Sequence, residues 1–253
     1  MPGAPVLGLI LSITLWWLLP GVVDAAPAIR PQDVPKILSQ KGKGVSALKA
    51  VMSITSKYDR DKSVHNIKGF VLYRRPMDFR FQGIGPAGNS LFELVSKATG
   101  FELYIPSDGK ILKGNKRCFA RKFPDVAELQ YLIPLALLQW RDVRFERAVA
   151  RNGTDTVIKL TFRGQKWEAT LDTEKLLVRR LVRLSRDVPD LTADFGDFGS
   201  GDLGWLPKSF RLRSRSGGWR TTVKMQGIKV NPFLVEKNFK LEPMYSPKIE
   251  ECR

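Results

Sequence analysis

The fold of this chain is decided by residues 64–82, which read VHNIKGFVLYRRPMDFRFQ. In its second part apolar and polar side chains alternate, with Met77, Phe79 and Phe81 on one side and Asp78, Arg80 and Gln82 on the other. A period of two is typical of a β-strand that has one buried face and one face in water. Residues 64–75 predict a preceding strand, so the stretch indicates two neighbouring strands of one antiparallel sheet.

The same alternation recurs on both sides of this stretch. Further strands are predicted at residues 48–55, 90–97, 101–106, 110–119, 144–151, 157–163, 165–171, 176–185, 207–214 and 219–230. Turn signals such as Ser107-Asp108-Gly109 and Asn152-Gly153 separate neighbouring strands. No linker rich in Pro, Ser or Gly divides the chain, so residues 26–253 are expected to form a single, mainly β domain.

A helix is predicted for Asp125–Gln139, where the strand pattern stops. Asp125 is the expected N-cap, and Glu128, three residues later, completes an arrangement that resembles a capping box. Pro134 is expected to kink or interrupt this helix. From Tyr131 to Trp140 nearly every side chain is apolar, so the segment must be covered on almost all sides. It is either a core helix packed on the sheet or a lid in the mouth of a curved sheet.

The N-terminal segment has the pattern of a secretory signal peptide, residues 1–25. Residues 6–19 are apolar and uncharged, and they fall short of the roughly 20 apolar residues that span a bilayer comfortably. Val23-Asp24-Ala25 offers small side chains for cleavage after Ala25. The first five residues carry no Lys or Arg, which departs from the usual signal. An uncleaved anchor and a buried core helix are the alternatives.

The chain is strongly basic, with 42 Lys and Arg against 25 Asp and Glu and a formal net charge of +17. Such a charge first suggests nucleic acid as the binding partner. Export argues against that partner, and the bases are scattered over the whole length rather than gathered in one arm. An anionic membrane surface or an anionic amphiphile remains as the partner. A solvated basic surface that keeps the protein soluble is the equal alternative.

Few residues have the chemistry of a catalytic or metal site. His65 is the one histidine, and nothing around it supplies the geometry of a nucleophile and a base, so no catalytic residue, metal or cofactor is expected. Acidic residues gather in residues 187–202, but their spacing is not that of an EF-hand loop, and solvated acids around a strand-loop-strand are the preferred interpretation. Cys118 and Cys252 either form a disulfide that ties the C-terminal tail to the fold or remain free thiols.

A set of short motifs points to a family. They are Gly69, Arg75-Pro76, Phe79-Arg80, Pro86, Phe92, Leu103-Tyr104-x-Pro106, Ala193-Asp194-Phe195, Gly204-Trp205-Leu206-Pro207-Lys208-Ser209-Phe210 and Val230-Asn231-Pro232, after a short predicted helix at residues 34–39. This pattern resembles the LolA/LolB family of bacterial lipoprotein carriers and related lipoprotein-sorting proteins. The likeness covers nearly all of residues 26–253. The chain departs from the family in being longer and more basic, and in having two cysteines.

The resemblance implies an incomplete antiparallel β-barrel, a strongly curved sheet whose open side is covered by a few short helices over a dry cavity for acyl chains. It implies that Arg75 holds the helical lid to the barrel and that Phe79 lies on a strand lining the cavity. The side chains expected to line this lipid-binding cavity are Phe79, Phe81, Leu132, Ile133, Leu135, Leu137 and Leu138. A sheet with so many apolar residues on one face must in any case close or be covered.

The function that follows is a soluble periplasmic carrier, not an enzyme, that binds acylated lipoproteins or lipids and takes them toward the outer membrane. The resemblance suggests an inner-membrane ABC transporter as donor and an outer-membrane acceptor. A periplasmic sensor or accessory subunit of an envelope complex with the same fold is the alternative. Nucleic acid is not an expected partner.

Sequencing of the mature N-terminus tests the assigned compartment. We expect the chain to begin at Ala26 in the soluble periplasmic fraction, because the apolar run is short and a cleavage site follows it. Intact residues 1–25 in a membrane fraction that resists carbonate extraction would instead favour an anchor.

Overall fold

The computed structural model describes residues 30–136, 143–152, 155–199, 205–243 and 246–252. Its strands are β1 Ala47–Tyr58, β2 Val64–Arg74, β3 Asp78–Ile84, β4 Ser90–Ser96, β5 Phe101–Ile105, β6 Lys110–Gly114, β7 Val143–Asn152, β8 Asp155–Phe162, β9 Gln165–Asp172, β10 Leu177–Ser185, β11 Val188–Phe198, β12 Pro207–Ser214, β13 Trp219–Val230 and β14 Lys248–Cys252. Its α-helices are α1 Val34–Gly42, α2 Lys116–Lys122 and α3 Pro124–Ala136, with short 3-10 helices at Pro31–Asp33 (η1), Pro106–Asp108 (η2) and Glu236–Phe239 (η5).

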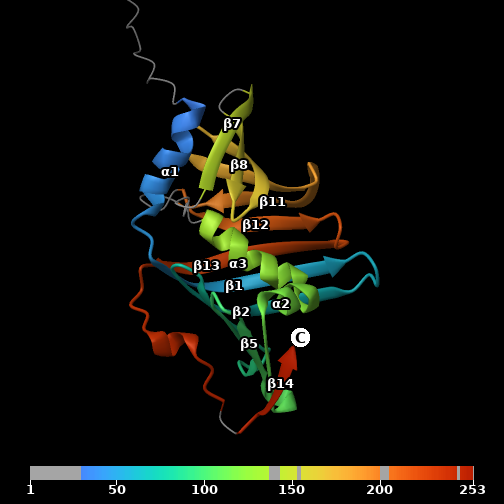
Figure 1. Cartoon of the computed structure of the whole chain (residues 1–253). Coiled ribbons are helices and arrows are strands. Elements are labelled where there is room, and N and C mark those ends of the chain that lie inside the picture. The colour runs from blue at the N-terminus through green and yellow to red at the C-terminus, as the bar shows by residue number, and fades with distance from the viewer. Residues whose placement is uncertain (1–29, 137–142, 153–154, 200–204, 244–245, 253) are drawn as a thin grey trace, which may run out of the picture.

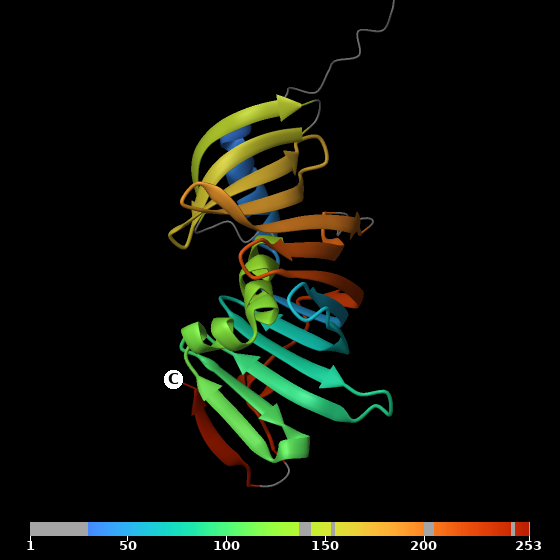
Figure 2. The same cartoon turned by 90° about the vertical axis from the view of Figure 1, so that its right-hand side faces the viewer.

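All fourteen strands belong to one sheet, in the order β14-β6-β5-β4-β3-β2-β1-β13-β12-β11-β10-β9-β8-β7. Strands β1 to β6 form one meander and β7 to β13 another, and the antiparallel pairing of β1 with β13 joins the two. Strand β14 breaks the antiparallel rule, because it runs parallel to β6. The sheet is strongly curved and does not close (Figures 1 and 2), so the fold class expected from the sequence, a mainly β incomplete barrel, is confirmed.

The buried side chains of the strands lie on one face of the sheet, which we call the inner face. Strand β8 alternates strictly between half-buried and buried residues, and β3 does the same, with Phe79 and Phe81 each 1% exposed. Gly69 on β2 makes room there, because a Cβ atom at this position would overlap the Gln82 carbonyl group and the Phe81 ring. The period-two pattern of the sequence therefore identifies the face that forms the core.

Helices α2 and α3 cover the inner face. They connect β6 to β7, the strand at the far edge of the sheet, and so cross in front of β12, β13, β1 and β2 (Figure 1). The side view shows them on the hollow side of the sheet (Figure 2). Helix α1 lies beside the β7 and β8 end of the sheet, where Val34 and Leu38 join the hydrophobic core. Within the described residues, no helix is both long and apolar enough to cross a bilayer.

The end of the predicted 110–119 strand and the start of the predicted helix need correction. The strand ends at Gly114, and Asn115 caps α2 by accepting a hydrogen bond from the Cys118 backbone N–H at 2.9 Å. Helix α3 begins at Pro124, a residue favoured in the first turn, so Asp125 is not its N-cap. The Phe123 carbonyl group accepts the first hydrogen bond of α3, from Ala127.

The chain after β13 forms a feature that the sequence did not suggest, which we call the C-terminal strap, residues 231–243. It runs over the outer face of the sheet, where Arg80 donates a hydrogen bond to the Asn238 carbonyl group at 3.1 Å. The Arg74 guanidinium lies 4.8 Å above the Phe239 ring. Lys97 and Arg74 both pair with Glu236 and lower the pKa of its carboxyl group to about 2. The strap leads to β14 at the edge of the sheet.

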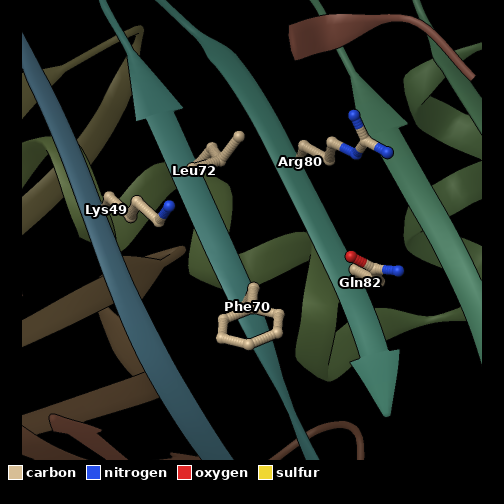
Figure 3. Close-up of a pocket in the computed structure, with 5 residues that line it drawn as sticks. All are labelled: Lys49, Phe70, Leu72, Arg80 and Gln82. Carbon is tan, nitrogen blue, oxygen red and sulfur yellow. The ribbon is translucent and has the colours of Figure 1, made fainter. Parts of the chain in front are cut away.

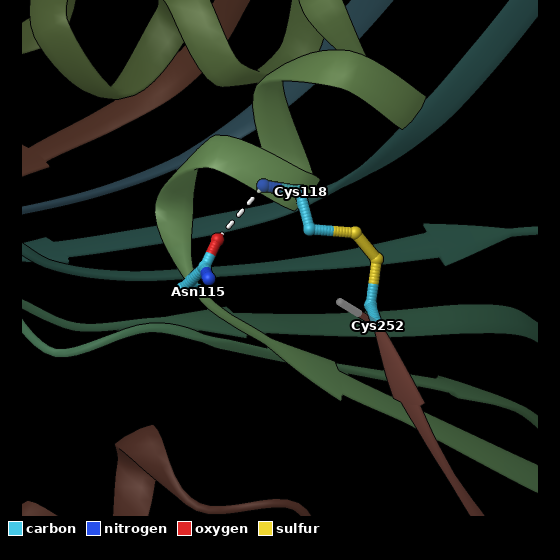
Figure 4. Close-up of a disulfide and its surroundings, with 3 residues drawn as sticks. All are labelled: Asn115, Cys118 and Cys252. Carbon is cyan, nitrogen blue, oxygen red and sulfur yellow. Dashed lines mark hydrogen bonds between the residues drawn. A yellow bond between two sulfur atoms is a disulfide. The ribbon is translucent and has the colours of Figure 1, made fainter.

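A disulfide joins Cys118 of α2 to Cys252 of β14 (Figure 4). Their Cα atoms lie 6.0 Å apart, within the usual range for such a bond, and 134 positions separate the two residues in the sequence. Because the strap lies on the outer face and α2 on the inner face, the bond holds the end of the chain around the edge of the sheet and fixes one end of the helical cover.

Reduction of this disulfide should weaken the protein without unfolding it. A bond that closes so long a loop restricts the unfolded chain strongly, so we expect its loss to lower the free energy of unfolding by about 2–4 kcal/mol. The sheet should keep its circular dichroism spectrum, because most of the buried surface belongs to the strands. The measurement is urea denaturation of the oxidised protein and of the Cys118→Ser/Cys252→Ser variant. Two free thiols in natively isolated protein would contradict the assignment.

Candidate functional site: an apolar inner face under helices

The side chains expected to line a lipid cavity come from two elements of one hydrophobic core. Phe79 and Phe81 are on β3, and Leu132, Ile133 and Leu135 are on α3. All of them belong to one hydrophobic cluster, in which none is more than 3% exposed. Leu137 and Leu138 lie outside the described residues. Sequence reasoning therefore selected residues that the fold places in one core, although 40 positions separate the end of β3 from the start of α3.

The inner face is closed in this conformation. Phe79 and Phe81 are buried in the same core as the described apolar side chains of α3, so the residues to which the resemblance assigns acyl chains are covered. Pro134 lies inside α3, where a proline removes one helical hydrogen bond and weakens the helix. An apolar ligand would reach these side chains only after the packing around them opens.

Arg75 does not make the contact that we expected for it. Its guanidinium donates hydrogen bonds to the carbonyl groups of Gly42 and Lys43, at the C-terminal end of α1. Among the described residues, no contact of Arg75 with the Tyr131–Ala136 part of α3 is found. A helix end with free carbonyl groups attracts a cation, which explains why Arg75, the residue directly after β2, binds the end of α1. Arg75 is thus tied to a helix, but to a different one.

An ion cluster of Arg183, Glu128 and Asp190 connects α3 to the sheet instead. Arg183 of β10 donates to both carboxylate oxygens of Glu128, at 2.8 and 2.9 Å, and to Asp190 of β11 at 3.0 Å. All three side chains are largely buried, with exposed fractions of 17%, 16% and 20%. The predicted capping role of Glu128 is therefore wrong, because its carboxylate leaves the helix start and reaches across to the sheet.

A β-bulge places Asp190 within reach of Arg183. Arg183 is opposite Leu191 on β11 and the next residue of β10, Leu184, is opposite Pro189, so Asp190 has no partner. An extra residue of this kind bends the strand and redirects a side chain. Without the bulge, Asp190 would point to the outer face like its neighbour Thr192.

Two carboxylates share one guanidinium in this cluster. Burial raises the pKa of Glu128, and the attraction of Arg183 does not fully offset the loss of water and the repulsion from Asp190. Burial disfavours the charge of Arg183, but its hydrogen bonds to Asp190 and the charge of Glu128 outweigh this and raise its pKa. A signal for the cluster was present in the sequence: Arg183 falls two residues after Leu181, at an inner-face position that should be apolar.

The other residues considered as functional candidates have structural surroundings. His65 is an exposed residue of β2 whose ring stands edge-on to Tyr58. In the acidic 187–202 segment, residues 188–198 form strand β11, and residues 200–202 lie outside the described residues. Asp187 and Asp194 pair with Lys166 and Arg180. No group of three or more acidic, cysteine or histidine side chains within the described ranges could hold a metal ion.

Neither the family models nor the curated proteins match this sequence. Several solved structures are similar to it in fold. A LolA superfamily protein from Nitrosomonas europaea aligns over 85% of this chain and 99% of its own, with a TM-score of 0.61 at 12% identity. A putative outer membrane lipoprotein-sorting protein domain from Vibrio parahaemolyticus covers 82% and 94%, with a TM-score of 0.60 at 14% identity.

A DUF1329 family protein from Desulfovibrio piger is similar to the same extent, with a TM-score of 0.60 at 11% identity over 82% of this chain and 95% of its own. At such identities the likeness concerns the fold. The three matches agree with the curved open sheet and the helices over its inner face. This chain has the LolA-like fold.

Proposed function

We propose that this protein is a soluble periplasmic carrier that holds the acyl chains of lipoproteins or lipids between the inner face and α3, and takes them toward the outer membrane. It acts without catalysis and without a cofactor. The observation that carries the proposal is that the core of a LolA-like fold is formed here by a helix lying on an open apolar sheet. An apolar ligand of similar volume can take the place of such a helix on the sheet.

Acyl chains fit this site by their chemistry. Burial of each methylene group gains about 0.8 kcal/mol, so a chain of ordinary length can compete with the apolar side chains of α3 for the same surface. Phe79 and Phe81, which the closed core buries, would then contact the ligand. Acylated lipoproteins or lipids are the proposed cargo, with an inner-membrane ABC transporter as donor and an outer-membrane protein as acceptor.

The ion cluster makes the movement of α3 easier than a purely apolar contact would. A buried ion pair must give up its hydration, which often cancels its attraction. The raised pKa of Glu128 is a sign of this balance. The disulfide meanwhile fixes α2, so α3 is the part of the cover that opens.

The same fold also suits a second function, a periplasmic sensor or accessory subunit of an envelope complex. The long C-terminal strap and the disulfide, which add a fixed surface around the sheet edge, favour a stable complex with a partner protein. Co-purification of acylated lipoproteins and lipids in stoichiometric amounts would favour the carrier, and an empty protein bound to an envelope protein would favour the sensor.

Acyl binding can be tested with a fluorescent fatty-acid probe. Phe79→Glu should abolish binding, because it places a carboxylate on the apolar inner face, where its desolvation costs several kcal/mol. The matched control is Leu91→Glu, since Leu91 is 45% exposed on β4 and the same substitution there leaves the site unchanged. Circular dichroism should show both variants folded. Equal binding by the wild type and both variants, or no binding at all, would reject the proposed function.

The ion cluster generates a separate prediction about stability. Arg183→Leu leaves Glu128 and Asp190 buried without their cation, so the free energy of unfolding should fall by about 3–5 kcal/mol. Arg180→Leu is the control: this arginine is 55% exposed and pairs with Asp194, so its loss should change stability by at most about 1 kcal/mol. Adding Glu128→Gln to Arg183→Leu should recover part of the loss. Equal effects of the two arginine substitutions would show that the cluster contributes nothing.

Glu128→Gln alone should hold α3 more firmly. Because the folded-state pKa of Glu128 is raised, its contribution to stability is fully present below its unfolded pKa and is lost as the pH rises through the folded value. The closed state is therefore favoured at low pH, and the wild type should take up the acyl probe more slowly on acidification. Glu128→Gln should bind the probe slowly at every pH. Stopped-flow fluorescence from pH 4 to 8 measures this, and faster uptake at low pH would contradict it.

A further inference from the structure

The outer face of the sheet is covered in one part and exposed in another. Over β3 to β5 the C-terminal strap covers it, and Val95, on the outer side of β4, is only 3% exposed for this reason. Over β12, β13, β1 and β2 the outward side chains are exposed or half-buried. We call this region the outer basic face, and its charged side chains are Lys49, Lys57, Lys68, Arg211, Arg213, Arg220, Lys224 and Lys229.

The strand register sets like charges opposite each other on this face. Arg220 of β13 is paired with Arg213 on one side and with Lys57 on the other. Lys49 of β1 is directly opposite Lys229 of β13. Like charges in directly opposite positions destabilise a sheet. Folding alone therefore does not explain this arrangement.

Elsewhere on the same sheet, several neighbouring positions have complementary charges, although Arg147 is opposite Lys159. Lys159 is opposite Glu168 and forms an ion pair with it, at 3.4 Å. Lys113 and Glu102 pair at 2.8 Å. Arg80 and Glu93, on adjacent strands, pair at 2.7 Å. These three ion pairs neutralise charges between neighbouring strands, whereas the opposed pairs Arg213–Arg220, Lys57–Arg220 and Lys49–Lys229 of the outer basic face bring like charges together.

Acidic side chains are scarce on this face. Asp59 pairs with Arg220 at 3.2 Å, and Asp194, at the β11 border opposite Arg211, forms its ion pair with Arg180. In the part of the chain that the structure describes, the remaining bases of the face form no ion pair. An external anion is therefore the partner that the charges require.

An apolar pocket lies at the β2 side of the face. Phe70, which is 44% exposed, and Leu72 form it with Lys49, Arg80 and Gln82, and its volume is about 230 Å³. Figure 3 shows the Phe70 ring and the Leu72 side chain standing out from β2, with Lys49 on one side and Arg80 on the other. Exposed aromatic and aliphatic side chains between bases match the boundary between phosphate headgroups and acyl chains in a bilayer.

We propose that the outer basic face docks on an anionic lipid bilayer, with its lysines and arginines against lipid phosphates and Phe70 and Leu72 at the headgroup boundary. An anionic surface attracts each nearby base, and together these attractions relieve the repulsion between Arg213, Arg220 and Lys57. The apolar pocket favours a bilayer over an acidic protein or a nucleic acid, which offer phosphates or carboxylates without an apolar layer. The face lies on the side of the sheet opposite α3, so the proposal does not rest on acyl binding.

Sedimentation with vesicles tests the proposal on the full mature chain. The wild type should bind vesicles of phosphatidylglycerol and phosphatidylcholine, bind pure phosphatidylcholine vesicles weakly, and bind less as salt increases. The variant Lys49→Gln/Lys68→Gln/Arg213→Gln/Lys224→Gln should weaken binding to the mixed vesicles at least about tenfold. Its melting temperature should equal or exceed that of the wild type, because like-charge contacts have been removed.

The control removes the same number of charges elsewhere. Lys36→Gln/Lys122→Gln/Lys175→Gln/Lys240→Gln changes exposed lysines on α1, α2, the β9–β10 turn and the strap, and should bind like the wild type. Phe70→Ser should weaken vesicle binding while leaving its salt dependence unchanged. Phe79→Glu should bind vesicles normally, which separates docking from acyl binding. Equal losses in the two quadruple variants, or binding to a soluble polyanion such as single-stranded DNA but not to vesicles, would overturn the proposal.

Discussion

The structure depends on one constraint, which is that a curved sheet with an apolar inner face must either close on itself or be covered. Strands β7 and β14 at the two edges do not pair with each other, so the sheet stays open. Helices α1, α2 and α3 then supply the cover, and they bury Phe79, Phe81 and their neighbours. A cover of helices can move as a unit, whereas a closing strand pair could not do so without breaking its hydrogen-bond ladder.

The way in which the cover is attached follows from the same constraint. Hydrophobic contact holds α3 to the sheet without fixing its position, while the bond between Cys118 and Cys252 anchors α2 and the pairing of Glu128 with Arg183 fixes the direction of α3. The two attachments differ in kind. The covalent bond cannot open under oxidising conditions, and the buried ion pair loses little free energy when it separates into water. Any opening of the inner face therefore starts at α3.

The two faces of the sheet have opposite chemistry because strand side chains alternate. Every residue that adds an apolar group to the inner face of β12, β13, β1 or β2 is followed by one that points outward, and many of these are Lys or Arg. The proposed acyl site and the proposed docking face thus lie on opposite sides of the central strands, with no overlap of the residues involved. The strap limits the second surface by covering the outer face of β3 to β5.

The sequence by itself determined the local features of this protein. The period of two located most of the strands, but not β14, and their buried face. Asn152-Gly153 marked the β7–β8 hairpin, and the apolar run after Tyr131 indicated a covered helix. Tertiary structure decided what depends on distant partners: that Arg75 binds the end of α1, that Glu128 meets Arg183 across 55 residues, and that β14 pairs in parallel with β6. The lysines and arginines that are scattered along the sequence become one face only through the register of β12, β13, β1 and β2. Local patterns report the environment of each residue, whereas pairing over long separations depends on which arrangement of the whole sheet buries the most apolar surface.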